Sequence, residues 1–487
     1  MAFLSIEFGV FVLLVAGASF FVEKICDAEN FAGRVLLFVA SLVFYVCADI
    51  RFLPFIVYVS LVSYASGFFL DSASRKPVLF LFVLLEIIPL LFFKYAPFLS
   101  GILLKKSISV FFPLGISFFT FQALSYTIDV FMGKVEREKS LVTVALFVGF
   151  FPFVTSGPIQ KAHNLIPELK KKRAFSYGNM TCGLKLFAFG AAKKLLVANA
   201  LALYVDSVYA SIAQSHGCAL FLASILYSFQ IYFDFSGYSD MAIGIARFFS
   251  FDVERNFDHP YLSQSIGEFW RRWHISLSSW LRDYVYFPLG GSRGSKLRCC
   301  LNLLVVFLVS GIWHGAHLNF VFWGLLHGVF QCAERLLKPV REKIGAPSWV
   351  HVLVTFVLVS FAWIFFRIER FDDAFFLVRK ICAVPQEILQ LVSAESVWAA
   401  KDLFKEFFGI DSAAVGFLAG FSKMVLFLGL FVAVDVATKD RDGLEIVGTK
   451  PLLVRWGLYA LLLWTLCYLM LFRGGDALSA NFIYNNF

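Results

Sequence analysis

The amino-acid sequence predicts an all-α polytopic integral membrane protein, with about 11 transmembrane helices and additional re-entrant or interfacial helices. Composition is the first reason, because 59% of the 487 residues are hydrophobic and only 16% are charged, outside the balance of soluble domains. The second reason is that uncharged runs recur at near-membrane length, at 8–22, 35–48, 52–70, 107–128, 141–160, 207–233, 344–366 and 456–472. A span needs about 20 apolar residues.

The first run is expected to be a membrane helix and not a cleaved signal peptide. No Lys or Arg precedes it, it lies next to Glu7, and more apolar runs follow at once. A secretory signal would begin with basic residues.

We expect one membrane domain over 1–487. Residues 1–105 are expected to form scaffold helices, because their polar residues occur only at the joints between apolar runs. Residues 106–335 are expected to form the catalytic core, because polar, Gly and aromatic residues lie between and inside the spans. Residues 336–487 are expected to form C-terminal helices and a tail. Within the last part, 367–411 alternates charged and apolar residues, which predicts an interfacial or extramembrane segment. Two spans, near 412–434 and 456–472, are expected to close the chain.

Charge and cysteine patterns argue against two classes of function. The net charge is +9, but the basic residues cluster between apolar runs, at Lys170–Arg173, Lys193–Lys194 and Arg271–Arg298. The positive-inside rule explains such clusters as cytoplasmic loops, so no nucleic-acid partner is expected. None of the nine cysteines belongs to an Asp-His-His-Cys array, which disfavours the cysteine-dependent protein palmitoyltransferases.

The longest uncharged run, 299–333, contains the first candidate site residue. As one straight helix it would extend about 50 Å, against a hydrocarbon core of roughly 30 Å, so it must bend or break. We expect the break near Gly311 and Gly315, because glycine tolerates non-helical backbone. Broken backbone at membrane depth survives only inside protein or along a water-filled cavity. His314, beside this break, is therefore a candidate site residue.

The alternative role for His314 is that of a core histidine bonded to a backbone carbonyl, and this is the favoured role for His317 and His327. His314 and His317 are three residues apart on one helical face, a spacing that is compatible with metal binding. No HExxH pattern and no nearby carboxylate completes such a site, and no metal is expected.

A second candidate stretch runs from Phe269 to Arg293, where cations alternate with Trp, Tyr and Leu at amphipathic spacing. Its cations are candidates to hold the phosphates of an anionic cofactor: Arg271, Arg272, Arg282 and Arg293. The alternative is that Trp and Arg anchor the segment at the lipid headgroups.

A third stretch, Tyr232 to Asp240, places the carboxylates of Asp234 and Asp240 at membrane depth. Buried carboxylates need partners, and Arg271 or Arg272 is the expected cation. A direct role in a site is the alternative to structural pairing.

At these residues the sequence resembles a known family, the membrane-bound O-acyltransferases, and specifically its bacterial alginate O-acetyltransferase branch. Seven blocks carry the resemblance in family order: Phe118 to Tyr126, Ser156 to Ile159, Tyr227 to Asp240, Asn256 to Tyr261, Glu268 to Ser278, Tyr286 to Arg293 and Gly311 to Ala316. A single Trp-His-Gly match would be weak evidence for the family, whereas seven matching blocks in the family's order are highly specific evidence for it. The N-terminal hundred residues match only in hydropathy.

The resemblance implies a helix bundle around a central channel, with a cytoplasmic entrance for the donor and an external entrance for the acceptor. His314 matches the family's catalytic histidine, and His274 its other characteristic histidine, whose role is structural or in shaping the donor passage. A neutral imidazole, favoured by burial, can take a hydroxyl proton as that oxygen attacks a thioester. The block from Tyr286 to Arg293 favours the acetyltransferase branch over the teichoic acid D-alanine exporters.

The resemblance also implies acetyl-CoA as donor substrate, no further cofactor, the bacterial cytoplasmic (inner) membrane as location and a serine-type extracytoplasmic polysaccharide acetyltransferase as partner. Phe482-Ile483-Tyr484 resembles a C-terminal motif whose tyrosine is proposed to relay the acyl group, which makes Tyr484 a candidate. Asn485-Asn486 departs from the Phe-Gln usual there. The alternative is an interfacial aromatic anchor.

Three other functions stay open at this point. A transporter or flippase for an acylated lipid would also need polar residues at membrane depth. An O-acyltransferase acting on a protein or lipid, or an assembly subunit of a catalytic partner, would share the same composition. The sequence does not name the polysaccharide.

Overall fold

The computed structural model describes residues 2–25, 30–70, 76–105, 110–409, 415–439 and 443–472. Over these ranges the chain is helical and forms no strand, which confirms the all-α prediction. Seven segments are long and apolar enough to cross a membrane: Ile6–Ile25, Ile50–Leu70, Lys76–Gly101, Tyr177–Ala210, Gly217–Phe248, Lys296–His314 and Ser348–Arg367. Three shorter apolar helices add to them. The prediction of about 11 spans holds only if these short helices are counted.

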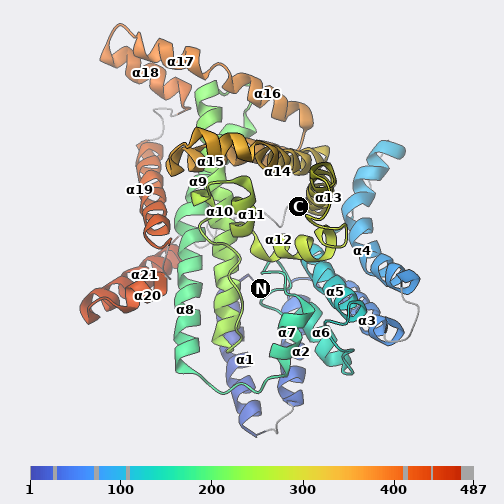
Figure 1. The fold of residues 1–487 in the computed structure, drawn as a ribbon. Coiled ribbons are helices and arrows are strands. Elements are labelled where there is room, and N and C mark those ends of the chain that lie inside the picture. The colour runs from blue at the N-terminus through green and yellow to red at the C-terminus, as the bar shows by residue number, and fades with distance from the viewer. Residues whose placement is uncertain are drawn as a thin grey trace. The chain divides into compact units, whose positions relative to one another are not determined.

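The chain forms two compact units, and Figure 1 labels the helices that build them. The first unit comprises residues 1–190, 238–256 and 274–291, and the second comprises 191–237, 257–273 and 292–487. The helices that lie wholly in the first unit are α1 (Ile6–Ile25), α2 (Phe31–Val46), α3 (Leu53–Leu70), α4 (Lys76–Leu103), α5 (Ile116–Phe131), α6 (Leu141–Gly149), α7 (Ala162–Lys170) and α12 (Ile275–Leu281). Two long helices, α8 (Tyr177–Ala192) and α10 (Gly217–Phe248), contribute residues to both units.

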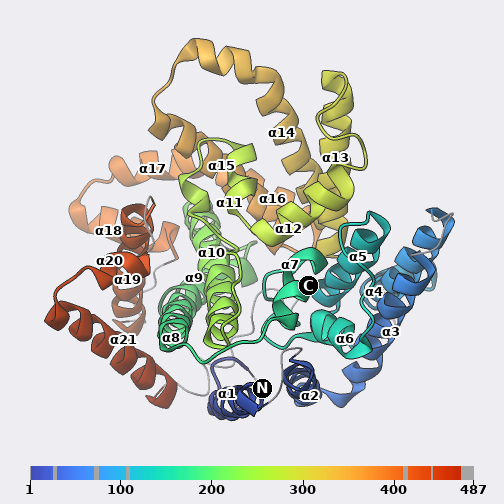
Figure 2. The same ribbon diagram turned by 60° about the horizontal axis from the view of Figure 1, so that its bottom comes forward.

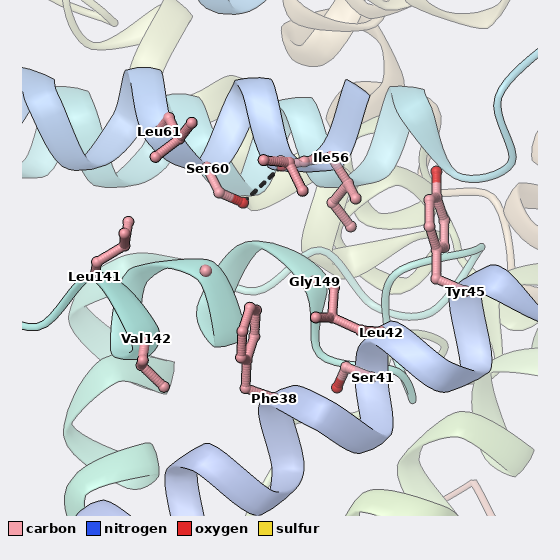
Figure 3. Close-up of a pocket in the computed structure, with 12 residues that line it drawn as sticks. Phe38, Ser41, Leu42, Tyr45, Ile56, Ser60, Leu61, Leu141, Val142 and Gly149 are labelled. Atoms are coloured by element: carbon pink, nitrogen blue, oxygen red, sulfur yellow. Dashed lines mark hydrogen bonds between the residues drawn. The ribbon is translucent and has the colours of Figure 1, made fainter. Parts of the chain in front are cut away.

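In the first unit α3 packs against α4, α5 and α6, and α2 packs against α6 (Figure 2). The cavity between α2, α3 and α6 is about 130 Å³ and mainly apolar (Figure 3). Its polar atoms bond within the protein, as where Ser60 Oγ donates to the Ile56 carbonyl at 2.7 Å. The titratable residue among those that line it, Tyr45, donates its hydroxyl to the Leu114 carbonyl at 2.7 Å.

The uncharged run 141–160 does not form a span. It forms the nine-residue helix α6, followed by turns from Phe151 to Ser156. Residues 143–159 are buried in the first unit, where Gln122 Nε2 donates to the Phe147 carbonyl at 2.8 Å. Non-helical backbone of this kind is stable at membrane depth because protein covers it.

Polar residues in the N-terminal helices are not confined to joints, contrary to expectation. Glu86 lies in the middle of α4 with no exposed surface. Ser63 and Thr127 hydroxyls donate to its Oε1 at 2.6 and 2.7 Å. A polar contact therefore joins α3, α4 and α5, which a hydropathy pattern does not reveal.

The second unit contains the π-helical turn Lys193–Ala198 and the following helices: α9 (Asn199–Ala210), α11 (Ile266–Arg272), α13 (Lys296–His314), α14 (Leu318–Ile344), α15 (Ser348–Arg367), α16 (Phe371–Ile381), α17 (Val384–Val392), α18 (Val397–Phe407), α19 (Val415–Ala437), α20 (Gly443–Gly448) and α21 (Leu452–Phe472). The interval 367–411 holds α16, α17 and α18, each of 9 to 11 residues. These are too short to span, as predicted. Apolar helices α19 and α21 occupy the two closing positions.

Two basic clusters predicted as loops are partly buried instead. Lys193 and Lys194 lie inside the segment Tyr177–Ala210 and are 8% and 9% exposed. Arg173 is also buried, and its backbone N–H donates to Glu23 at 2.7 Å. Charge spacing along the chain does not distinguish a solvated cation from one that faces a buried carboxylate.

Candidate active site

The run predicted to break does so between α13 and α14. α13 ends at His314, Gly315 and Ala316 follow outside any helix, and His317 is the N-cap of α14. The two helices pack along each other (Figure 2). A Cβ on Gly311 would lie 2.3 Å from the Phe320 carbonyl oxygen, and one on Gly324 would lie 2.3 Å from that of Phe307. Glycine therefore permits this close approach, as small residues commonly do between membrane helices.

We expect Gly311→Ala to destabilise the fold by about 1–3 kcal/mol, because backbone must move to admit the methyl group. The measurement is the melting temperature in detergent. Gly17→Ala is the matched control, since nothing lies within 4 Å of its added Cβ. Equal melting temperatures for the two variants would show that the contact between α13 and α14 can relax without cost.

His314 lies in an aromatic enclosure and is 3% exposed. Trp323 and Phe366 approach its ring edge-on, each with a centroid separation of 5.0 Å, and Trp313 does so at 4.8 Å. These rings come from the end of α13, from α14 and from α15. Together they exclude water from most of the imidazole.

His327 is a core histidine, as favoured by the sequence, but its hydrogen bond is to a tryptophan side chain and not to a backbone carbonyl. It has no exposed surface, and Trp270 Nε1 donates to its Nδ1 at 3.2 Å. Its ring and that of His314 both contact Trp323, each at 5.0 Å between centroids. His327 thus helps to hold the tryptophan that borders His314.

The interpretation of His317 was wrong on two points. The side chain is exposed and not in the core. Because the helix ends at His314 and restarts after His317, the two histidines do not share one helical face.

His274 lies in the first unit and is 1% exposed. Its backbone has a φ of 43° just before α12. Its Nδ1 lies 3.3 Å from both Asn256 Oδ1 and Ser276 Oγ, and Asn256 Oδ1 also accepts the Ser276 backbone N–H. Burial lowers the pKa of His274 to about 3. A neutral histidine in this network orders the turn before α12, which fits the structural alternative for this residue.

The expected pairing of the aspartates with Arg271 or Arg272 was wrong for Asp234. Lys194 Nζ binds Asp234 Oδ1, and both residues belong to the second unit. Arg272 instead pairs with Glu268 at 2.9 Å, four residues earlier on α11. The cation that pairs with buried Asp234 is therefore Lys194, which the charge pattern had assigned to a cytoplasmic loop.

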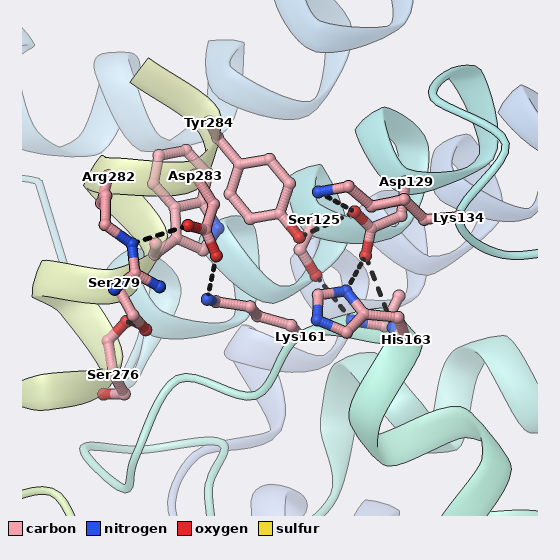
Figure 4. Close-up of polar contacts among 12 residues, drawn as sticks. Ser125, Asp129, Lys134, Lys161, His163, Ser276, Ser279, Arg282, Asp283 and Tyr284 are labelled. Atoms are coloured by element: carbon pink, nitrogen blue, oxygen red, sulfur yellow. Dashed lines mark hydrogen bonds and ion pairs between the residues drawn. The ribbon is translucent and has the colours of Figure 1, made fainter. Parts of the chain in front are cut away.

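The four candidate phosphate-binding arginines differ in surroundings. Arg271, Arg282 and Arg293 are exposed. Arg282 Nε donates to Asp283 Oδ1 at 2.9 Å, and Asp283 also binds Lys161 (Figure 4). Sequence reasoning missed Lys161, although it follows the block from Ser156 to Ile159 by two residues. Tyr484 lies outside the described residues.

Residues 52–371 match the membrane-bound O-acyltransferase family, and this stretch includes both His274 and His314. The chain belongs to this family. It is therefore a multi-pass membrane-bound O-acyltransferase, as its resemblance indicated.

Curated relatives place it among enzymes that modify polymers. The chain is 38% identical to a probable alginate O-acetylase of Azotobacter vinelandii over 358 residues, covering 70% of this chain and 71% of that protein. It is 33% identical to the peptidoglycan O-acetyltransferase of Helicobacter pylori over 404 residues, or 75% and 77% of the two chains. A teichoic acid D-alanyltransferase of Bacillus subtilis is 27% identical over 273 residues, or 53% and 69%. The O-acetylating relatives are thus more similar than this D-alanylating one, in line with the branch prediction.

Proposed function

We propose that this O-acyltransferase moves acetyl groups from cytoplasmic acetyl-CoA across the bacterial inner membrane toward an extracytoplasmic polysaccharide, with His314 as general base. The observation that carries the proposal is the burial of His314 at the end of α13, a candidate membrane span, where the chain breaks before α14 packs against it. Ionisable groups at membrane depth are costly and usually mark a functional pathway. The central channel implied by the resemblance is part of this proposal.

In the proposed reaction the His314 imidazole accepts the proton of an acceptor hydroxyl while that oxygen attacks the thioester carbonyl. The new C–O bond forms, the C–S bond breaks, and the proton passes to the leaving thiolate to give free CoA. General-base assistance of this type contributes about 10²–10⁴-fold. Trp313, Trp323 and Phe366 assist by excluding water that would otherwise hydrolyse the thioester.

The exposed arginines are proposed to hold the donor's phosphates. Arg271, Arg282 and Arg293 present guanidinium groups outside the candidate spans, and Arg272 follows Arg271 directly in the sequence. Guanidinium groups bind phosphate oxygens in bidentate geometry. The names of the alginate and peptidoglycan relatives support a glycan as the final acceptor.

We further propose Tyr484 as an acyl acceptor that His314 serves, and a serine-type acetyltransferase as the protein that takes acetate from it. Tyr484→Phe is expected to abolish polysaccharide acetylation and stable labelling of the protein, because the phenolic oxygen that would carry acetate is gone. The measurement is acetyl label retained on purified protein after incubation with acetyl-CoA. Unchanged acetylation in Tyr484→Phe would leave the tail as an aromatic anchor and would not affect the role of His314.

The transfer itself is tested in proteoliposomes that receive acetyl-CoA carrying labelled acetyl on one side only. The proposal predicts loss of thioester and appearance of label on an acceptor supplied at the opposite face, without CoA crossing. Transport of an intact acylated lipid with no thioester consumption would make the protein a transporter instead.

A further inference from the structure

In the first unit, Lys161 and Arg282 converge on one carboxylate (Figure 4). Lys161 Nζ donates to Asp283 Oδ2, and Arg282 Nε donates to Asp283 Oδ1 at 2.9 Å. Lys161 is the N-cap of α7, whereas Arg282 and Asp283 begin the π-helical turn Arg282–Tyr286. Such turns are rare and frequently occur at functional sites.

The pair of cations is partly open to solvent. The Lys161 and Asp283 side chains are 10% and 16% exposed, whereas Arg282 is 56% exposed. Burial acts to raise the pKa of Asp283, but the hydrogen bonds from Arg282 and Lys161 outweigh it and keep the pKa below its ordinary value. Asp283 is therefore an anion at neutral pH that neutralises a site with two cations.

The neighbouring carboxylate provides a contrast. Asp129 has no exposed surface and accepts from Tyr284 Oη at 2.9 Å, with His163 Nδ1 at 2.7 Å and Lys134 Nζ at 3.8 Å (Figure 4). This aspartate is enclosed by its partners, as a structural carboxylate is. Asp283 has an exposed arginine at one oxygen, so an incoming anion can reach its cations.

Exposed lysines near the site also indicate which side of the membrane it faces. Residues Lys134, Lys139 and 170–172 are exposed, and the positive-inside rule assigns exposed lysines between apolar runs to the cytoplasm. Phosphate oxygens accept the same charge-assisted bonds from lysine and arginine that a carboxylate does. A cytoplasmic ligand with several phosphate charges can therefore replace a single aspartate.

We propose that Lys161 and Arg282 bind phosphate groups of the thioester donor, and that Asp283 is an internal anion which the donor displaces. This inference rests on the proposed function, since it takes acetyl-CoA as the donor. Asp283 lowers the affinity for every anion and thereby selects the ligand with the most phosphate charge. In this scheme Lys161 binds a phosphate group of the donor, and Asp283 sets how much negative charge a ligand must carry in order to bind.

The test compares Kd values for CoA and for pantetheine, which has no phosphate, by calorimetry on the full chain in detergent. Lys161→Ala is expected to raise the Kd for CoA about tenfold, the loss expected for one charge-assisted bond. Asp283→Asn is expected to lower it about threefold or more. Lys161→Arg should restore most of the affinity, and pantetheine binding should stay within about twofold throughout.

Lys134→Ala is the matched control, because Lys134 belongs to the neighbouring cluster and contacts Asp129 and not Asp283. The melting temperature of each variant identifies misfolding. Equal Kd values for CoA in wild type, Lys161→Ala and Asp283→Asn would overturn the inference. Turnover of acetyl-CoA is measured in parallel, so absent turnover with the expected Kd changes would contradict the proposed function and support this site.

A lipid headgroup could supply the same phosphate chemistry. Vesicles with and without phosphatidylglycerol distinguish this source. If Lys161→Ala abolished stabilisation by phosphatidylglycerol while the Kd for CoA stayed at the wild-type value, the site would bind lipid and the donor assignment would be wrong.

Discussion

His314→Ala is expected to reduce acetyl transfer from acetyl-CoA by about 10²–10⁴-fold, the contribution of a general base. The imidazole is the ionisable group enclosed by Trp313, Trp323 and Phe366 at the end of α13. Its removal takes away the group that is proposed to accept the hydroxyl proton. The measurement is thioester consumption by purified protein, at equal membrane abundance of each variant.

The matched control is His317→Ala, three residues further on. This histidine is exposed at the N-cap of α14, so turnover should stay within about twofold of wild type. His314→Gln keeps much of the side-chain volume and separates lost chemistry from lost packing. Wild-type consumption by both His314 variants would remove the catalytic assignment and favour the transporter function.

Lys194→Met is expected to destabilise the protein by about 3–5 kcal/mol, the cost of removing one partner from a buried ion pair. The Lys194 and Asp234 side chains are 11% and 2% exposed, and both lie within candidate membrane spans. Without the ammonium group, the buried carboxylate loses the ion pair with Lys194. The effect should be visible as a large fall in melting temperature in detergent and in the yield of folded protein.

Two further variants make this prediction specific. Lys338→Met removes a cation from an exposed pair, with side chains 72% and 66% exposed, and is expected to cost less than about 1 kcal/mol. The double variant with Lys194→Met and Asp234→Leu should recover much of the loss, since apolar replacement of a whole buried pair is often neutral. A melting temperature of Lys194→Met equal to that of Lys338→Met would contradict the assignment.

Several features of the fold could be predicted because they depend on local composition. The break near Gly311–Gly315 followed from a run too long for a bilayer, and the structure confirms it. The short helices in 367–411 followed from charges too frequent for a span. His314 could be selected for the same reason, since it lies where the helix had to end.

The run 141–160 shows why the number of spans was harder to predict. Hydropathy measures a preference to leave water, and protein satisfies that preference as well as lipid does. α6 and the turns after it are apolar because other helices cover them. Length and composition alone therefore assigned to the bilayer a segment that is part of the protein core.

By itself, the sequence determined that lipid surrounds much of the chain, where the longest uncharged run breaks and which histidine lies at that break. Only the tertiary structure decided the partners of the buried charges. Asp234 binds Lys194 and not an arginine of α11, and Lys161 binds a carboxylate 122 residues away. The physical reason is that a buried charge is stabilised by whichever opposite charge the fold brings within a few ångströms, and that distance is independent of spacing along the chain.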